Sequence, residues 1–150
     1  MEITTERVKE LRDMTGVSIM QCRRALEETG GDLARAAEVL AKHSGASAAK
    51  KANRELKAGT VGSYVHDGAI GALVLLSSET DFVAKNTEFA QLAREIAMQV
   101  AAMAPETTED LLAEPYIKDG GKTIQNLLHE ATQKFGERVE IGGFARLANR

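Results

Sequence analysis

The dipeptide Asp67-Gly68 separates two strand-like segments, and it constrains the fold more than any other feature of the sequence. Asp-Gly favours the tight type I′ turn of a β-hairpin, because both central residues of that turn need a positive φ. The flanking residues 60–66 and 69–77 therefore predict two antiparallel strands. The second strand is apolar on both of its faces from Ile70 to Leu76, so we expect both faces to be covered.

Three short helices are predicted in the first 42 residues from the residues at their ends. Thr4 or Thr5 can cap the first helix, and Gly16 stops it. Ser18 begins a capping-box pattern before the second helix, and Asp32 can cap the third. Apolar residues recur three and four positions apart in the third helix, as in a helix packed on one face. We interpret residues 1–42 as a small three-helix module.

Residues 43–58 differ in composition from what precedes them. They begin with small residues and continue with the basic side chains Lys50, Lys51, Arg54 and Lys57. This pattern predicts a linker that is helical towards its end. A basic segment of this kind suits RNA or an acidic protein surface, although composition alone favours a solvated linker helix.

The rest of the chain, residues 59–150, is predicted as mixed helix and strand. After the hairpin, the patterns predict a long helix, an irregular connection, a further helix and a last strand, over residues 87–103, 106–121, 123–135 and 138–147. Gly142-Gly143 in the last strand indicates a bend or a close backbone approach. The fold class is therefore α+β: a three-helix module, a helical linker and a small antiparallel three-stranded sheet covered by helices.

Composition excludes several classes of protein. The chain has 19 Lys and Arg against 22 Asp and Glu, which is not the strongly basic profile of a dedicated nucleic-acid binder. The single cysteine, Cys22, excludes an intrachain disulfide framework and a multi-cysteine zinc site. No apolar run is long enough for a membrane span, and the first residues lack a signal pattern, so we expect a cytoplasmic protein without a membrane partner.

Catalytic motifs are missing from the sequence. Its three histidines lie on separate predicted elements: His43, His66 and His129. Cys22 is expected to be a packing residue, and Glu79 and Asp81 are expected to serve as turn and cap residues. We therefore expect no catalytic residue, no metal site and no cofactor, and we do not expect an enzyme.

The junction formed by residues 77–86, between the second strand and the long helix, has a different character. Phe82 follows polar residues at a corner where side chains project from a fixed scaffold. If Phe82 points to solvent, it is the kind of aromatic anchor that fills a pocket on a partner, with Asp81 beside it for hydrogen bonds. The residues alone leave another arrangement open, in which Asp81 caps a helical turn and Phe82 packs into the core.

Two segments of the chain, residues 11–26 and 79–85, resemble the two signatures of the translation elongation factor Ts family. Ala48–Ala52 and the Gly136-Glu137 pair before the last strand are similar to the family as well. Matching segments run in family order from residue 3 to residue 147. The Thr-Asp-Phe-Val-Ala motif is specific when the N-terminal module precedes it.

This resemblance implies guanine-nucleotide exchange on elongation factor Tu, which restores its GTP form after each delivery of aminoacyl-tRNA. It implies an N-terminal module that resembles a ubiquitin-associated domain and docks on the GTPase domain. The positions that match in this module are Arg12, Ile19, Met20 and Arg23.

The resemblance also implies a role for the strand-to-helix corner, whose matching positions are Thr80, Asp81, Phe82 and Val83. The corner would enter the GTPase near its Mg²⁺ and its phosphate-binding loops, with Phe82 as a wedge. Displacing Mg²⁺ weakens GDP retention without covalent chemistry, so the chain needs no cofactor of its own. Short family members pair through their core sheets, which implies a homodimer that also covers the second face of the apolar strand.

Two other functions remain open at this stage. A passive adaptor would dock its three-helix module on a partner without accelerating nucleotide release. An RNA-binding protein would use the basic residues of the linker and would show a steep salt dependence. Nucleic acid is the partner that the sequence favours least.

Overall fold

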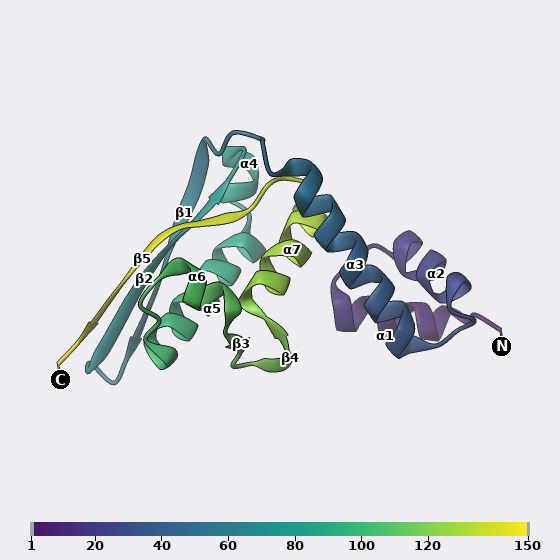
Figure 1. The fold of residues 1–150 in the computed structure, drawn as a ribbon, viewed down its shortest axis with the longest axis horizontal. Coiled ribbons are helices and arrows are strands. Elements are labelled where there is room, and N and C mark those ends of the chain that lie inside the picture. Colours follow the sequence, from purple (N-terminus) through teal and green to yellow (C-terminus); the bar gives the residue numbers. More distant parts are fainter. Residues whose placement is uncertain (1, 150) are drawn as a thin grey trace. The chain divides into compact units, whose positions relative to one another are not determined.

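The computed structural model describes residues 2–149 and has the expected α+β fold, with three N-terminal helices followed by a small antiparallel three-stranded sheet (Figure 1). Contacts divide the chain into two compact units. The first unit reaches to Ala52 and includes His129–Gly136. The second unit consists of Asn53–Leu128 and the residues from Glu137 onwards.

The first unit contains helices α1 (Thr5–Thr15), α2 (Ile19–Glu28) and α3 (Leu33–Lys51). Their predicted caps are confirmed: the side chains of Thr4, Ser18 and Asp32 accept hydrogen bonds from backbone N–H groups three residues further on, at 3.2, 3.3 and 3.1 Å. Gly16 ends α1 in the left-handed conformation, with φ 71°.

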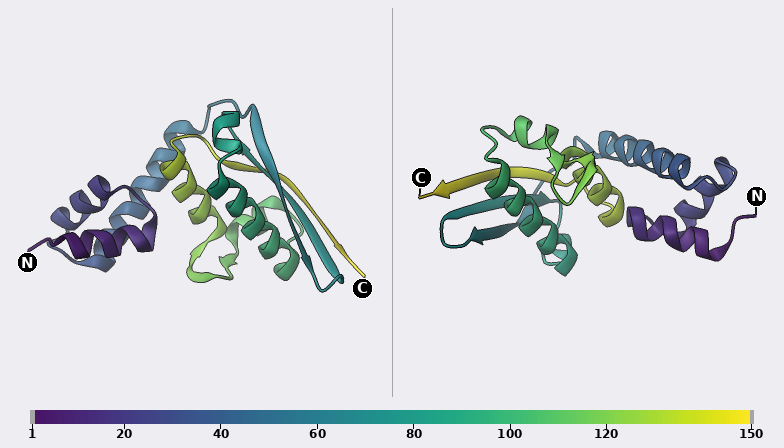
Figure 2. Two further views of the ribbon diagram at one scale, coloured as in Figure 1. Left: turned by 180° about the vertical axis from the view of Figure 1, so that it is seen from behind. Right: turned by 90° about the horizontal axis from the view of Figure 1, so that it is seen from below.

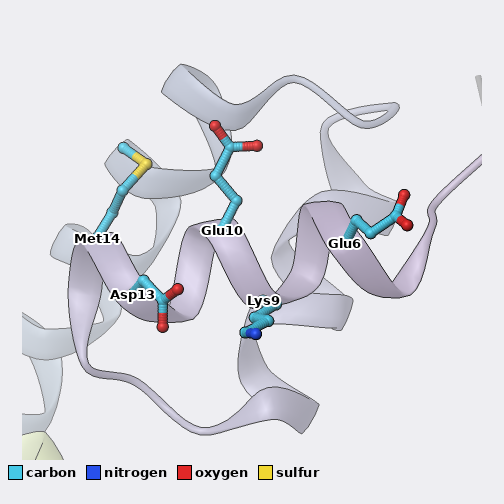
Figure 3. A pocket seen from close by; sticks show the side chains of 5 residues that line it. All are labelled: Glu6, Lys9, Glu10, Asp13 and Met14. Carbon is cyan, nitrogen blue, oxygen red and sulfur yellow. The ribbon is translucent and has the colours of Figure 1, made fainter.

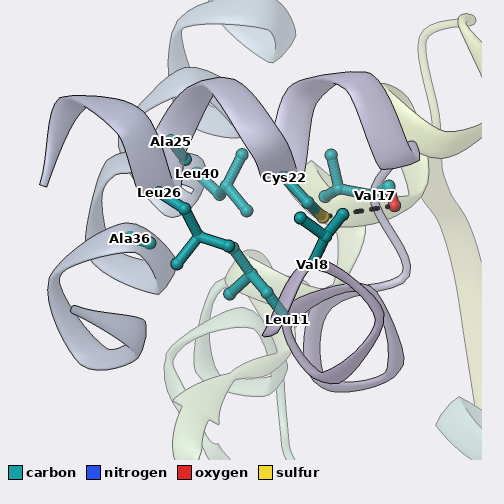
Figure 4. Packing of buried hydrophobic residues seen from close by; sticks show 8 residues of the cluster. All are labelled: Val8, Leu11, Val17, Cys22, Ala25, Leu26, Ala36 and Leu40. Carbon is teal, nitrogen blue, oxygen red and sulfur yellow. Dashed lines mark hydrogen bonds between the residues drawn. The ribbon is translucent and has the colours of Figure 1, made fainter. Parts of the chain in front are cut away.

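The three helices enclose one apolar core (Figure 4), formed by Val8, Leu11, Val17, Cys22, Ala25, Leu26, Ala36 and Leu40. Within it, the Cys22 thiol donates to the carbonyl oxygen of Val17 at 3.5 Å. Burial of these side chains supplies the main stabilisation of so small a helical unit, because isolated helices of this length are marginal in water.

Helix α3 continues through Lys51, beyond the end near residue 42 that the sequence analysis expects. The expectation that residues 43–58 are helical towards their end is wrong, since residues 43–51 are helical and residues 52–57 lie in no helix or strand. Alanine-rich sequence favours the extension. A tertiary contact also favours it, because the buried Ser44 hydroxyl donates to the side-chain oxygen of Gln133 within the same unit.

The second unit is built on a sheet of strands β1 (Ala58–His66), β2 (Ile70–Ser78) and β5 (Glu140–Ala148), in the order β1-β2-β5. The predicted hairpin is confirmed, since Asp67 and Gly68 have φ values of 50° and 67°. The predicted irregularity at Gly142-Gly143 is confirmed as well. The pairing of β2 with β5 shifts there by one residue, and a Cβ on Gly142 would lie 2.8 Å from the Leu75 side chain.

Helix α5 (Thr87–Met103) lies across one face of this sheet (Figures 1 and 2). Its fully buried residues include Phe89, Ile96 and Val100. The helix approaches β1 so closely at Gly62 that a Cβ there would lie 2.4 Å from the Ala93 carbonyl carbon. This contact needs a glycine because the atoms that oppose it belong to the backbone.

The opposite face of the sheet is uncovered in the single chain, so the cover that we expect for the second face of β2 does not come from residues 2–149 of the same chain. Leu73 and Leu75 of β2 are 51% and 40% exposed. Val61, Val65 and Leu147 of the flanking strands are exposed on the same face. We call these five residues the open sheet face.

Residues 106–121 are not the irregular connection that the sequence analysis expects. They contain helix α6 (Thr108–Ala113), the short strand β3 (Pro115–Tyr116) and most of β4 (Asp119–Thr123), which leads into α7 (Ile124–Phe135). The fully buried Gln99 holds this region, since its amide donates to the Pro115 carbonyl at 3.0 Å and accepts from Ile117 N–H at 2.9 Å.

Across residues 2–149, no helix combines the length and the apolar character that a membrane crossing requires.

Candidate functional site

The candidate site is the corner that follows β2, where the short helix α4 (Asp81–Ala84) begins. Thr80 is the N-cap of this helix, and its hydroxyl accepts a hydrogen bond from Val83 N–H at 3.4 Å. Asn86 then caps α5, because its side chain accepts from Glu88 N–H at 2.8 Å. Two caps within seven residues make this a sharp corner with defined backbone bonds on both sides.

Phe82 points outward from this corner and is 85% exposed. Its two successors in α4 behave in the opposite way, since Val83 is 4% exposed and Ala84 is 6% exposed. One side of the turn is thus packed into the second unit, while the ring stands in solvent beside the exposed Asp81. A large aromatic side chain in this position offers apolar area to a partner at no cost to the core.

The same corner is bonded to residues far along the chain. The Glu137 carboxylate accepts hydrogen bonds from the backbone N–H groups of Glu79 and Thr80 and from the Thr80 hydroxyl. No role is predicted for Glu137 from the sequence. Its only signal there is the Gly136-Glu137 pair that resembles the family, and no local pattern links that pair to residue 80.

The residues singled out in the N-terminal module are all exposed: Arg12 near the end of α1, and Ile19, Met20 and Arg23 in α2. Ile19 and Met20 are 56% and 77% exposed, so α2 presents two large apolar side chains to solvent. Arg23 is partnered by Glu27 one turn later, with 3.5 Å between Nε and Oε1. This surface combines apolar and positively charged groups, as docking surfaces do.

The residues considered for chemistry do not form a reactive site. Cys22 is fully buried, and its burial raises the pKa of its thiol, which disfavours the nucleophilic thiolate. Glu79 accepts a hydrogen bond from Arg138 N–H and so serves the local structure. The expectation that Asp81 is a cap residue is wrong, because Thr80 caps α4 and Asp81 lies exposed in its first turn. Within residues 2–149, no three His, Cys, Asp or Glu side chains are arranged to hold a metal ion.

Two hollows in the surface of residues 2–149 are large enough for a small ligand. Figure 3 shows the first, which is lined along α1 by Glu6, Lys9, Glu10, Asp13 and Met14. The second, in the other unit, is lined mainly by apolar side chains together with Tyr64, His66 and Arg146. The Tyr64 hydroxyl and His66 Nδ1 lie 3.0 Å apart, and Arg146 Nε donates to the Ala101 carbonyl at 3.1 Å. The Tyr64–His66 contact is exposed to solvent, and the His66 side chain is 60% exposed, so this pair lacks the enclosed setting of a reactive site.

Three of the basic residues in segment 43–58 have local partners. Lys51 donates to Ser47 at 3.0 Å, and Lys57 lies 3.6 Å from Glu55. Arg54 lies 3.5 Å from Glu79. The carboxylates beside Arg54 and Lys57 offset part of the positive charge that an RNA interface would require, whereas Lys51 keeps its charge because Ser47 is neutral.

Comparison with known proteins identifies similar chains. A family model described as elongation factor TS matches residues 79–150. The chain is 37% identical to an elongation factor Ts from Thermodesulfovibrio yellowstonii, in an alignment that covers 97% of this chain and 96% of that protein. It is 36% identical to an elongation factor Ts from Coprothermobacter proteolyticus, with 97% and 98% of the two chains covered.

Longer relatives match as well. An elongation factor Ts from Clostridium kluyveri is 41% identical, and the alignment covers 97% of this chain but 48% of the relative. The alignment with the Thermodesulfovibrio protein extends over 190 positions, which exceeds the 150 residues of this chain. That relative therefore contains residues that have no counterpart here.

Proposed function

Because the chain belongs to the elongation factor Ts family, we propose that it is a guanine-nucleotide exchange factor for elongation factor Tu in translation elongation. It acts in the cytoplasm, by binding alone, and forms no covalent intermediate. The exposure of Phe82 beside buried neighbours in α4 is the observation that carries this proposal.

In this proposal, Thr80, Asp81, Phe82 and Val83 form the surface that enters the GTPase next to its Mg²⁺ and phosphate-binding loops. The Phe82 ring acts as the wedge that displaces Mg²⁺, whose charge holds the diphosphate. The thermodynamic basis is linkage. A partner that binds the nucleotide-free form more tightly than the GDP form must weaken GDP binding by the same factor.

The first unit serves as the docking module. Arg12, Ile19, Met20 and Arg23 contact the GTPase domain and bring the Phe82 corner to its target. The exposed apolar side chains of Ile19 and Met20 support this role, since exposed apolar groups beside an arginine are typical of the centre of a protein interface.

The experiment that tests the function is the release of GDP from elongation factor Tu with and without the chain. An exchange factor accelerates release. A passive adaptor binds the GTPase and leaves the release rate unchanged, and this outcome would replace the proposal with the adaptor.

We further propose that two copies pair through the open sheet face. Val61, Val65, Leu73, Leu75 and Leu147 are all exposed on one side of the sheet, and contiguous apolar surface of this kind is typical of an interface. A symmetric pair buries the same side chains from both copies and covers the second face of β2.

Replacing Leu73 with glutamate should therefore dissociate the pair. A two-fold interface places both introduced carboxylates in an apolar contact, and we expect the dimer to weaken by about 100-fold or more. Light scattering should give twice the 16.1 kDa of one chain for the wild type and a single-chain mass for the variant. Met103→Glu, at an exposed apolar residue on α5, is the matched control and should keep the wild-type mass. A single-chain mass for the wild type would contradict the proposal.

A further inference from the structure

We infer that Glu137 is a positioning residue for nucleotide exchange, which fixes the Phe82 corner in its protruding conformation through a carboxylate clamp. The inference rests on the proposed function, because it assigns a role to Glu137 in the action of Phe82. Glu137 is hydrogen-bonded to residues 79 and 80, and it affects Phe82 through these two residues.

The first half of the clamp is formed by hydrogen bonds from the backbone of the corner to the Glu137 carboxylate. Its Oε1 accepts hydrogen bonds from the N–H groups of Glu79 at 3.1 Å and Thr80 at 3.0 Å. Its Oε2 accepts from the Thr80 hydroxyl at 2.6 Å. Three charge-assisted bonds thus join one side chain to a segment 57 residues earlier in the chain.

The second half of the clamp runs in the opposite direction. The Glu79 carboxylate accepts from the backbone N–H of Arg138, with 2.6 Å between Oε2 and N. Glu137 therefore bonds the backbone of Glu79, and Glu79 bonds the backbone of the residue that follows Glu137. Arg54 lies 3.5 Å from the same Glu79 oxygen and offsets the charge of that carboxylate.

The clamp reaches Phe82 through Thr80. The Thr80 hydroxyl donates to Glu137 and accepts from Val83 N–H, so one oxygen joins the carboxylate to the first turn of α4. Helix α4 has four residues, which is too short to be stable by itself. The orientation of Phe82 therefore depends on the bonds at the N-terminus of this turn.

A fixed ring reduces the conformational entropy that is lost when the corner enters a partner. Without Glu137, the corner samples other conformations, and only a fraction of the molecules present the ring correctly. Glu137→Ala should therefore reduce the acceleration of GDP release by about 10-fold when Phe82 is present. The same change should have less than about a twofold effect in a Phe82→Ala chain, because positioning has no value without the ring.

The experiment combines this double-mutant cycle with amide hydrogen exchange of the free chain. In Glu137→Ala, the amides of Glu79 and Thr80 should exchange at least about 10-fold faster, while amides in the middle of β2 keep their wild-type rates. Glu137→Gln should restore part of both effects, since its amide oxygen can accept from the two N–H groups. Glu140→Ala is the matched control, because the Glu140 carboxylate pairs with the Arg138 guanidinium at 2.8 Å, whereas its pairing with Ser77 in the sheet involves the backbone, which the substitution keeps.

The outcomes separate this inference from the function on which it rests. A wild-type chain that does not accelerate GDP release overturns the proposed function and the inference with it. A wild-type chain that accelerates release, together with a Glu137→Ala chain of equal activity or of unchanged amide protection, overturns the inference alone. Equal losses from Glu137→Ala with and without Phe82 also overturn it, because they assign Glu137 a role separate from the ring.

Discussion

Replacing Phe82 with alanine will slow the chain-stimulated release of GDP by about 30-fold or more. The ring is 85% exposed and stands on a turn whose next two residues are buried, so it has the character of an interface anchor. Truncation of such anchors costs about 2–4 kcal/mol, and each 1.4 kcal/mol corresponds to tenfold. The rate is measured with a fluorescent GDP analogue bound to elongation factor Tu, at a saturating concentration of the chain.

The variant should keep the stability of the wild type, because an exposed ring contributes little to the core. Met103→Ala removes another exposed apolar side chain from the same unit and is the matched control. It should leave the release rate unchanged. If Phe82→Ala stimulated release as well as the wild type does, the wedge mechanism would be contradicted.

Replacing Gly62 with alanine will destabilise the second unit by about 3 kcal/mol, at the upper end of what overpacking costs. The added Cβ would lie 2.4 and 2.6 Å from the Ala93 carbonyl carbon and oxygen, and 2.6 Å from Arg94 N. All three opposing atoms are backbone, so α5 must move away from β1 and lose contacts along its buried face. Urea unfolding followed by circular dichroism measures the loss.

Gly120→Ala in β4 is the control for this prediction, since a Cβ on Gly120 meets no atom within 4 Å. It should unfold at a urea concentration close to that of the wild type. Equal unfolding midpoints for Gly62→Ala and Gly120→Ala would show that α5 does not press on β1 as described.

Local signals explain the part of the fold that the sequence predicted correctly. The caps Thr4, Ser18 and Asp32 act on residues three positions away, and the Asp67-Gly68 turn depends on its own dihedral angles. Patterns with so short a range are readable without knowledge of the rest of the chain.

The errors arose where tertiary contacts decide the structure. Helix α3 is extended next to Gln133, a residue 89 positions away from its partner Ser44. The region after Pro105 takes its form from the buried amide of Gln99. Neither contact leaves a periodic signal in the sequence. The open sheet face is a different case, because apolar strand residues predict burial without saying whether the same chain or a second copy provides it.

The candidate site also has one part that could be predicted from the sequence and one part that could not. The outward direction of Phe82 follows from the cap at Thr80 and from burial of the next two residues, and the sequence analysis had this arrangement as one of two alternatives. The Glu137 clamp joins residues 57 positions apart, and its geometry became visible only in the structure.

The release of GDP from elongation factor Tu at increasing concentrations of this chain is the most direct test of the account. Excess unlabelled GDP traps the free GTPase, and the release rate is followed by stopped-flow fluorescence. We expect a rate that rises with chain concentration and saturates when every GTPase molecule is bound. A rate that stays flat while complex formation is observed would contradict it and would leave the chain as an adaptor.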